Sequence, residues 1–255
     1  MLDIASVTLT VRDLDRVARF YQDVIGLTPI ATDATSVWLG VDGRQLLLLL
    51  HRPDLRPVDP AAAGLFHTAF LLPTRADLGR WLTHAAANGI KLQGAADHLV
   101  SEAVYLADPE GNGIEIYADR PRTAWRWEGT QIAMVNARLD LPALMGLDAA
   151  PWTAAPSGTT IGHVHLQVGD IAAAEPFYVA GLGLDITRRM PQALFISAHG
   201  YHHHLALNTW NSQGAGPRDP TRAGLAIVTL RTGAPRPSVT DPWGTAITFT
   251  TGDLP

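Results

Sequence analysis

The stretch Val7-Thr8-Leu9-Thr10-Val11-Arg12-Asp13-Leu14 decides the fold, because it returns later as Val164-His165-Leu166-Gln167-Val168-Gly169-Asp170-Ile171. Each copy continues with a helix-like segment, an adjacent Phe-Tyr pair and a Gly-Leu pair. The two aspartates lie 157 positions apart (170 − 13). An internal repeat of this kind indicates an architecture built from copies of one structural unit.

A second pair of related segments completes the pattern. The stretch 63–67 (Ala-Gly-Leu-Phe-His) matches 223–227 (Ala-Gly-Leu-Ala-Ile), and 108–111 (Asp-Pro-Glu-Gly) matches 241–244 (Asp-Pro-Trp-Gly). The offsets are 160 (223 − 63) and 133 (241 − 108), so the last copy is 27 residues shorter (160 − 133), roughly the length of a helix. We therefore expect four units, the last of them abbreviated.

Each unit is expected to run strand, helix and then three strands (βαβββ). Alternating apolar residues predict the strands, and Asp13 is placed to cap a helix that ends near Gly26. The other expected elements are strands at 28–30, 36–39, 45–50, 65–72, near 91, at 103–106 and 113–117, and a helix at 75–88. The fold class is thus α+β. We expect residues 1–120 to hold the first pair of units, 121–160 a connector and 161–255 the second pair.

Composition limits the function. The chain has 255 residues, of which 47% are hydrophobic, with 19 Lys and Arg against 24 Asp and Glu. A net charge of −5 does not favour nucleic acid or an anionic membrane as a partner. The absence of cysteine excludes disulfides, thiolate metal sites and a cysteine nucleophile, and it suits a reducing compartment. With no basic and apolar leader at the first residues, we expect a cytoplasmic protein and a small-molecule substrate.

Two polar residues stand in apolar strands. His67 follows Leu-Phe, and Glu115 lies between two isoleucines. Alone, such a histidine is more often a hydrogen-bonded core residue than a ligand, but a buried carboxylate requires a partner or a metal. Two histidines and one carboxylate on neighbouring strands would form the facial triad of non-haem iron sites, and His163 can supply the third side chain.

Three consecutive histidines form a further cluster. In an extended chain His203 points to one face, and His202 and His204 point to the other. A solvated cluster is the simple interpretation, but an ordinary strand gains nothing from three desolvated imidazoles, which favours a functional one. His165 lies on the same face as His163 and is a weaker candidate for lining a pocket.

The repeated units and the segment 108–115 resemble the vicinal oxygen chelate superfamily, which includes glyoxalase I, antibiotic resistance proteins and extradiol dioxygenases. The pattern from His98 through Tyr105 to Glu115 is similar to the extradiol ring-cleavage signature, with a departure at Ala96. The segments 97–103 and 200–204 further resemble the bacterial catechol 2,3-dioxygenase branch. The similarity runs over nearly the whole chain.

This resemblance implies an enzyme of aromatic hydrocarbon catabolism. It would insert O2 into a catechol-type diol at a non-haem Fe(II) centre and give a ring-opened semialdehyde; Mn(II) is the alternative metal. The implied metal ligands are His67, Glu115 and His163, and the implied catalytic residues are His203, His98 and Tyr105. The choice of His203 over its two neighbours stays open, because a shift of one residue reverses the face.

The order of the units predicts an unusual pairing. His163 lies in the third unit, whereas His67 and Glu115 lie in the second. If units paired in sequence order, no domain would hold a complete triad. We therefore expect two glyoxalase-like domains in which units two and three pair, and one and four pair; a domain-swapped dimer would also close the site.

Two other function classes remain open. One is a non-oxidative, metal-dependent isomerase, lyase or resistance enzyme of the same superfamily, and the other is a non-catalytic protein that binds an aromatic ligand. Dependence on O2 separates the first from a dioxygenase, and loss of function in Glu115→Ala separates the second. A homo-oligomer is also left open, because the abbreviated fourth unit leaves its sheet incompletely covered.

Overall fold

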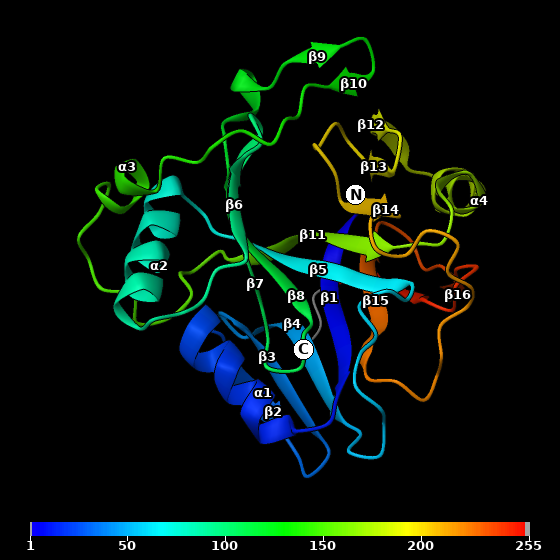
Figure 1. Ribbon diagram of the computed structural model, residues 1–255, viewed down its shortest axis with the longest axis horizontal. Coiled ribbons are helices and arrows are strands. Elements are labelled where there is room, and N and C mark those ends of the chain that lie inside the picture. The colour runs from blue at the N-terminus through cyan, green and yellow to red at the C-terminus, as the bar shows by residue number, and fades with distance from the viewer. Residues whose placement is uncertain (1, 253–255) are drawn as a thin grey trace.

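The computed structural model describes residues 2–252 and contains two mixed β-sheets that lie side by side (Figure 1). One sheet has the strand order β16-β17-β15-β1-β4-β3-β2, and the other has the order β12-β13-β14-β11-β5-β8-β7-β6. The first comprises β1 (Leu2–Val11), β2 (Thr28–Thr32), β3 (Ser36–Val41), β4 (Arg44–His51), β15 (Gly224–Thr232), β16 (Val239–Thr240) and β17 (Ala246–Thr250). The second comprises β5 (Gly64–Leu71), β6 (Gly94–Asp97), β7 (Ser101–Ala107), β8 (Gly113–Asp119), β11 (Thr160–Gln167), β12 (Asp185–Met190), β13 (Ala193–Ser197) and β14 (Leu205–Asn208).

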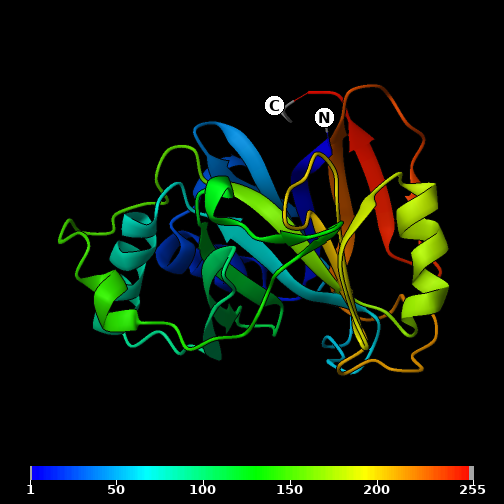
Figure 2. The same cartoon turned by 90° about the horizontal axis from the view of Figure 1, so that it is seen from above.

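Helices cover the two sheets at opposite sides of the molecule. Figure 2 shows α1 (Leu14–Phe20), α2 (Arg75–Ala87) and α3 (Leu141–Met145) on one side and α4 (Ile171–Glu175) on the other. Both α1 and α4 continue into π-helical turns, at Tyr21–Ile25 and Pro176–Gly181. A short 3-10 turn, Arg122–Ala124, follows β8. No helix among residues 2–252 is both long enough and apolar enough to span a membrane.

Local sequence explains where the helices begin. The Asp13 side chain accepts a hydrogen bond from the Arg16 backbone N–H at 3.1 Å, and Asp170 accepts one from Ala173 at 2.8 Å. Thr74 and Asp77 form a reciprocal capping box at the start of α2. These side chains satisfy backbone donors that an α-helix leaves unpaired at its first turn.

Each sheet joins an early and a late part of the chain. β1 pairs antiparallel with β15, and β5 pairs antiparallel with β11. The strand orders place those of units one and four in one sheet and those of units two and three in the other, within a single chain. This confirms the α+β class, and neither sheet is made from one half of the sequence.

Two details differ from the expected elements. The strand expected near Lys91 lies at β6 instead, because the antiparallel ladder with β7 begins where Gly94 pairs with Tyr105. Residues 121–159 are not a plain connector: they carry a two-stranded ribbon, β9 (Trp127–Glu128) and β10 (Gln131–Ile132), as well as α3. As expected, no helix follows β15 in the described part of the fourth unit.

Candidate active site

Three adjacent strands at the centre of the second sheet carry a histidine, a glutamate and a histidine on one face. His67 comes from β5, Glu115 from β8 and His163 from β11. The ladders set His163 opposite Ala69 and Ala69 opposite Glu115. The strand pairing between distant units therefore brings together the three side chains that the sequence singled out.

The three side chains are buried and converge on one point. One candidate ligand atom from each lies within 4.8 Å of the other two. Glu115 Oε2 is 2.9 Å from His67 Nε2 and 3.1 Å from His163 Nε2. Together they form a buried two-histidine, one-carboxylate site.

These distances fit a metal ion. Two atoms bound to one ion at about 2.1 Å and at right angles lie about 3.0 Å apart, as on one face of an octahedron. His67 Nε2 is fully buried and lacks a hydrogen bond of acceptable geometry, even though Glu115 lies beside it. An orphaned imidazole nitrogen of this kind is expected where its lone pair points at an ion rather than at a proton donor.

The protonation states also suit a cation. Burial alone would raise the pKa of Glu115, but the adjacent His163 and His67 rings hold that pKa well below its usual range. Burial lowers the pKa of His163 to about 4, although Glu115 acts in the opposite direction. An ionised carboxylate and a neutral imidazole are the forms that bind metals.

A cavity of about 550 Å³ opens in front of the triad. Its wall combines the three candidate ligands with mainly apolar and aromatic groups, as is usual for a site that binds a small organic molecule. The side chains around it that can bind a metal or exchange a proton are His67, His98, Tyr105, Glu115, His163, His165 and His203. All the expected catalytic residues therefore line one cavity.

His98 and Tyr105 act as a pair. His98 Nε2 lies 2.6 Å from the Tyr105 hydroxyl, and His98 Nδ1 lies 2.8 Å from the Val135 carbonyl oxygen. Because a carbonyl oxygen only accepts, Nδ1 carries the proton of a neutral His98 and Nε2 accepts from the tyrosine. Burial, and then the charge of Glu115, raise the pKa of Tyr105 well above its usual value, so the hydroxyl stays protonated.

The structure separates the three consecutive histidines. They lie in the loop before β14 rather than within the strand, and only His203 lines the cavity. The His203 ring lies 4.1 Å from the His163 ring, between centroids. Burial, followed by the neighbouring imidazoles, lowers the pKa of His203 well below its usual value. His204 instead contacts the Ser197 hydroxyl through Nδ1, at 3.0 Å.

His165 lines the same cavity beside His67. The two rings lie 5.0 Å apart, and Phe66 and Trp210 pack against His165 at 5.0 and 5.2 Å between ring centroids. Burial lowers the pKa of His165 well below its usual value. The side chain is therefore a neutral part of an aromatic wall.

Sequence reasoning missed several parts of the cavity. Met134, Val135 and Asn136 come from the segment expected to be a connector, and Met190 and Trp210 come from the third unit. Val135, Met190 and Trp210 are more than two-fifths exposed, which places apolar groups at the surface beside the cavity. None of these residues belongs to a motif, so no sequence signal pointed to them.

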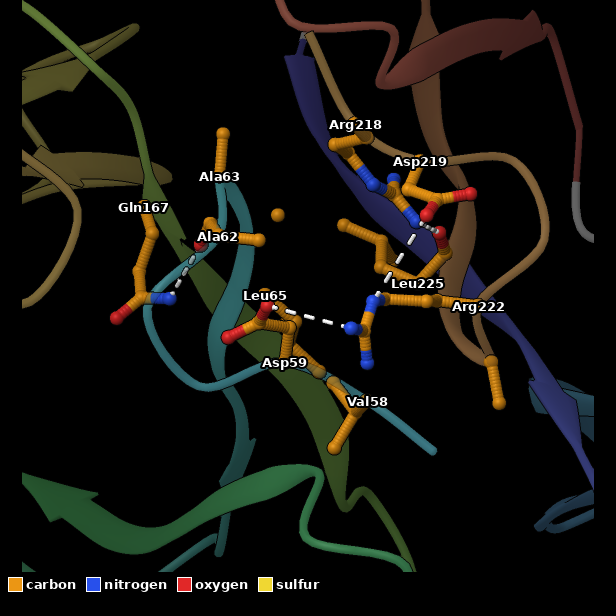
Figure 3. Close-up of a pocket in the computed structure, with 12 residues that line it drawn as sticks. Val58, Asp59, Ala62, Ala63, Leu65, Gln167, Arg218, Asp219, Arg222 and Leu225 are labelled. Carbon is orange, nitrogen blue, oxygen red and sulfur yellow. Dashed lines mark hydrogen bonds and ion pairs between the residues drawn. The ribbon is translucent and has the colours of Figure 1, made fainter. Parts of the chain in front are cut away.

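A second, much smaller hollow lies at the seam between the two sheets (Figure 3). Its volume is about 30 Å³, which is room for about one or two water molecules. The polar groups there are already partnered: Gln167 donates to the Ala62 carbonyl at 2.8 Å, and Arg222 lies 3.7 Å from Asp59. This hollow is too small to be a substrate site.

Comparison with known proteins agrees with this geometry. The profile of the Glyoxalase/Bleomycin resistance protein/Dioxygenase superfamily matches residues 3–116 and 160–234. The chain belongs to this superfamily. It is 41% identical to a catechol-2,3-dioxygenase of Bacillus subtilis (strain 168) over 234 residues, which is 89% of this chain and 81% of the relative. It is also 29% identical to biphenyl-2,3-diol 1,2-dioxygenase 3 of Rhodococcus globerulus, over 46% of this chain and 63% of the relative.

Solved structures share the fold. A putative dioxygenase from Bacillus subtilis aligns over 98% of this chain and 86% of its own length, with a TM-score of 0.64 and 13% identity. Glyoxalase I from Zea mays aligns over 98% of this chain and 92% of its own length, with a TM-score of 0.60 and 16% identity. The expected superfamily is thus confirmed, and so is the expected relationship to catechol 2,3-dioxygenase.

Proposed function

We propose that the protein is an extradiol ring-cleaving dioxygenase that inserts O2 into a catechol-type aromatic diol and releases a ring-opened semialdehyde. The observation that carries this proposal is the buried triad of His67, Glu115 and His163 at the base of a cavity lined by His98, Tyr105 and His203. The 41% identical relative bears the name of a catechol-2,3-dioxygenase, which supports the same reaction class.

We propose Fe(II) as the metal, with Mn(II) as the alternative. Two imidazoles and one carboxylate leave several positions of an octahedral ion open for other ligands, which is the arrangement of non-haem iron oxygenases. When bound there, the ion would supply open coordination positions for the two diol oxygens and for O2. His67, Glu115 and His163 are the residues that would hold it.

The remaining polar residues would handle protons. A catechol must lose its hydroxyl protons to chelate a metal, and His203, a neutral imidazole on the cavity wall, is placed to accept one and to return it later. Tyr105 and His98 form a hydrogen-bonded pair in the same cavity, and the Tyr105 hydroxyl would turn away from His98 Nε2 to donate to an oxygen of the bound molecule. The aromatic wall would exclude water and orient the ring.

The test is anaerobic reconstitution with Fe(II), followed by addition of catechol and air. Uptake of O2 with formation of the yellow semialdehyde, both lost in His163→Ala and Glu115→Ala, is the expected result. Tight metal binding without uptake across a panel of catechols would favour a non-oxidative isomerase, lyase or resistance enzyme. Absence of metal binding would leave a protein that binds an aromatic ligand without catalysis.

The partners are a small aromatic diol and O2, and we propose a cytoplasmic location within aromatic hydrocarbon catabolism. Nucleic acid and membranes are not proposed as partners. A homo-oligomer through the sheet of the abbreviated fourth unit and the division of the chain at residues 120 and 160 remain predictions.

A further inference from the structure

A row of three side chains leads from the cavity wall to the protein surface. His203 Nδ1 lies 2.7 Å from His202 Nδ1, and His202 Nε2 lies 2.9 Å from Asp119 Oδ1. His202 is fully buried, whereas the Asp119 side chain is about one quarter exposed, at 24%. His203 is the member that lines the cavity. Asp119 ends β8, the strand that also carries Glu115.

The row is held rigidly. Thr187 donates its hydroxyl to the His202 carbonyl oxygen. The backbone N–H of His204 donates to the Ile196 carbonyl, and the His204 carbonyl accepts from the Val164 N–H, each at 3.0 Å. The His202 ring packs against Tyr201 and Trp125, with centroids 4.1 and 5.3 Å away. These contacts hold the His202 ring, and so the positions of its two nitrogens, in place.

The two hydrogen bonds along the row determine the tautomers of His202 and His203. An ionised carboxylate only accepts, so His202 Nε2 must carry a proton. A neutral ring has one N–H, which leaves His202 Nδ1 as an acceptor. Two nitrogens 2.7 Å apart share one proton, and that proton must then belong to His203 Nδ1. It follows that Nε2 of a neutral His203 carries no proton.

His203 Nε2 is the ring nitrogen that a molecule in the cavity can reach. His203 Nε2 has no hydrogen-bond partner among residues 2–252, and the ring lies on the cavity wall. An unprotonated Nε2 can accept a proton from a molecule in the cavity, whereas the opposite tautomer would present an N–H there. The choice of tautomer therefore decides whether His203 meets that molecule as an acceptor or as a donor.

We propose that His202 and Asp119 are positioning residues that hold His203 with its unprotonated Nε2 at the cavity. The tautomer assignment stands on the hydrogen-bond geometry alone. Its consequence for turnover rests on the proposed function, in which His203 is the proton acceptor. Mutation of the hydrogen-bond partners that orient a functional histidine typically lowers activity by about 10–100-fold.

The first test reads the tautomers directly. The protein, with ¹⁵N-labelled histidine and loaded with diamagnetic Zn(II), is examined by long-range ¹H–¹⁵N correlation, with His202→Phe and His203→Gln used to assign the two rings. The expected spectrum shows His202 protonated on Nε2 and His203 protonated on Nδ1. Asp119→Asn should move part of the His203 population to the Nε2–H tautomer, because an amide can donate to His202 as well as accept from it. A wild-type His203 protonated on Nε2, or a His202 protonated on both nitrogens, would overturn the proposal.

The second test is kinetic and uses the Fe(II)-loaded enzyme. We expect Asp119→Asn to lower kcat by about 10–100-fold with KM for catechol unchanged, and Asp119→Glu to restore most of it. Glu175→Gln is the matched control, because Glu175 is a partly exposed carboxylate that pairs with Arg189 outside the cavity. Wild-type kcat in Asp119→Asn, or equal loss in Asp119→Asn and Asp119→Glu, would contradict the proposal. If the wild-type enzyme takes up no O2 with any catechol, the proposed function fails, and the spectra still decide the tautomers.

Discussion

Across the centre of one sheet, three residues in register read His163, Ala69 and Glu115; across the other sheet, the same row reads Ser6, Thr229 and Thr248. The first row holds two candidate metal ligands, whereas the second holds only hydroxyl groups. Thr229 and Thr248 bond to each other at 2.9 Å, and the Ser6 hydroxyl is buried without a partner. Equivalent positions of the two sheets therefore hold candidate metal ligands in one sheet and uncharged hydroxyl side chains in the other.

The two sheets also share a turn in which one buried aspartate accepts several hydrogen bonds. Asp108 accepts hydrogen bonds from two backbone N–H groups of its turn and from the Tyr21 hydroxyl. Asp241 does the same in the other sheet, with Tyr178 as its tyrosine. The repeat thus keeps the turn and the helix contact in both sheets, while the ligand positions differ. The fold and the site therefore depend on different residues of the same unit.

The largest expected effect is loss of the carboxylate ligand. Glu115→Ala should lower metal affinity by more than about 100-fold, since loss of an outer partner alone costs about 10–100-fold. It should also abolish O2 uptake. Thr248→Ala, at the equivalent place in the other sheet, is the control and should leave both unchanged. Calorimetric titration with Fe(II) under anaerobic conditions measures the affinity. An equal loss of affinity in both variants would contradict the prediction that only the sheet with Glu115 binds the metal.

A smaller effect is expected at the cavity wall. Tyr105→Phe removes the hydroxyl that donates to His98, and it should lower kcat by about 10–100-fold while metal affinity is kept. Tyr178→Phe is the matched control, because its hydroxyl bonds to Asp241 in the other sheet and should affect only stability. Oxygen-electrode kinetics on both variants check this. Unchanged kcat in Tyr105→Phe would remove the tyrosine from the proposed chemistry.

The smallest effect concerns the shared turn. Asp241→Asn should lower the free energy of unfolding by about 1–3 kcal/mol, because it weakens charge-assisted hydrogen bonds to buried donors. It should leave O2 uptake by the folded protein unchanged, since the turn belongs to the sheet without the triad. Urea unfolding and oxygen-electrode measurements test the two halves of this prediction. Loss of activity in a folded Asp241→Asn would show that the two sheets are coupled.

Much of the fold and site was predictable because the signals were local or repeated. The helix cap at Asp13 follows from its place before a helix-like segment, Asp170 repeats that position, and Glu115 stands out by its apolar neighbours. The reversed order of the ligand-bearing units predicted that distant strands pair, and the strand order agrees with that prediction. That prediction started from the triad, whose members His67, Glu115 and His163 were inferred from their place in apolar strands and from the family resemblance.

The rest depended on contacts between segments that share no pattern. Val135 approaches His98 only because residues 121–159 fold back over the cavity. Asp119 meets His202 across 83 positions of sequence, and neither residue belongs to the motif that marks Glu115. The strand near Lys91 was misplaced because pairing with β7, not local propensity, sets its start. Such features follow from tertiary register, which a single sequence does not display.

We expect one metal site, assembled from the second and third units on the sheet where they meet. The most direct measurement is anaerobic Fe(II) titration of His163→Ala beside Ser6→Ala, which stands at the equivalent place in the other sheet. We expect His163→Ala to lose tight metal binding although His67 and Glu115 remain, and Ser6→Ala to bind Fe(II) as the wild type does. Tight Fe(II) binding retained in His163→Ala would contradict it.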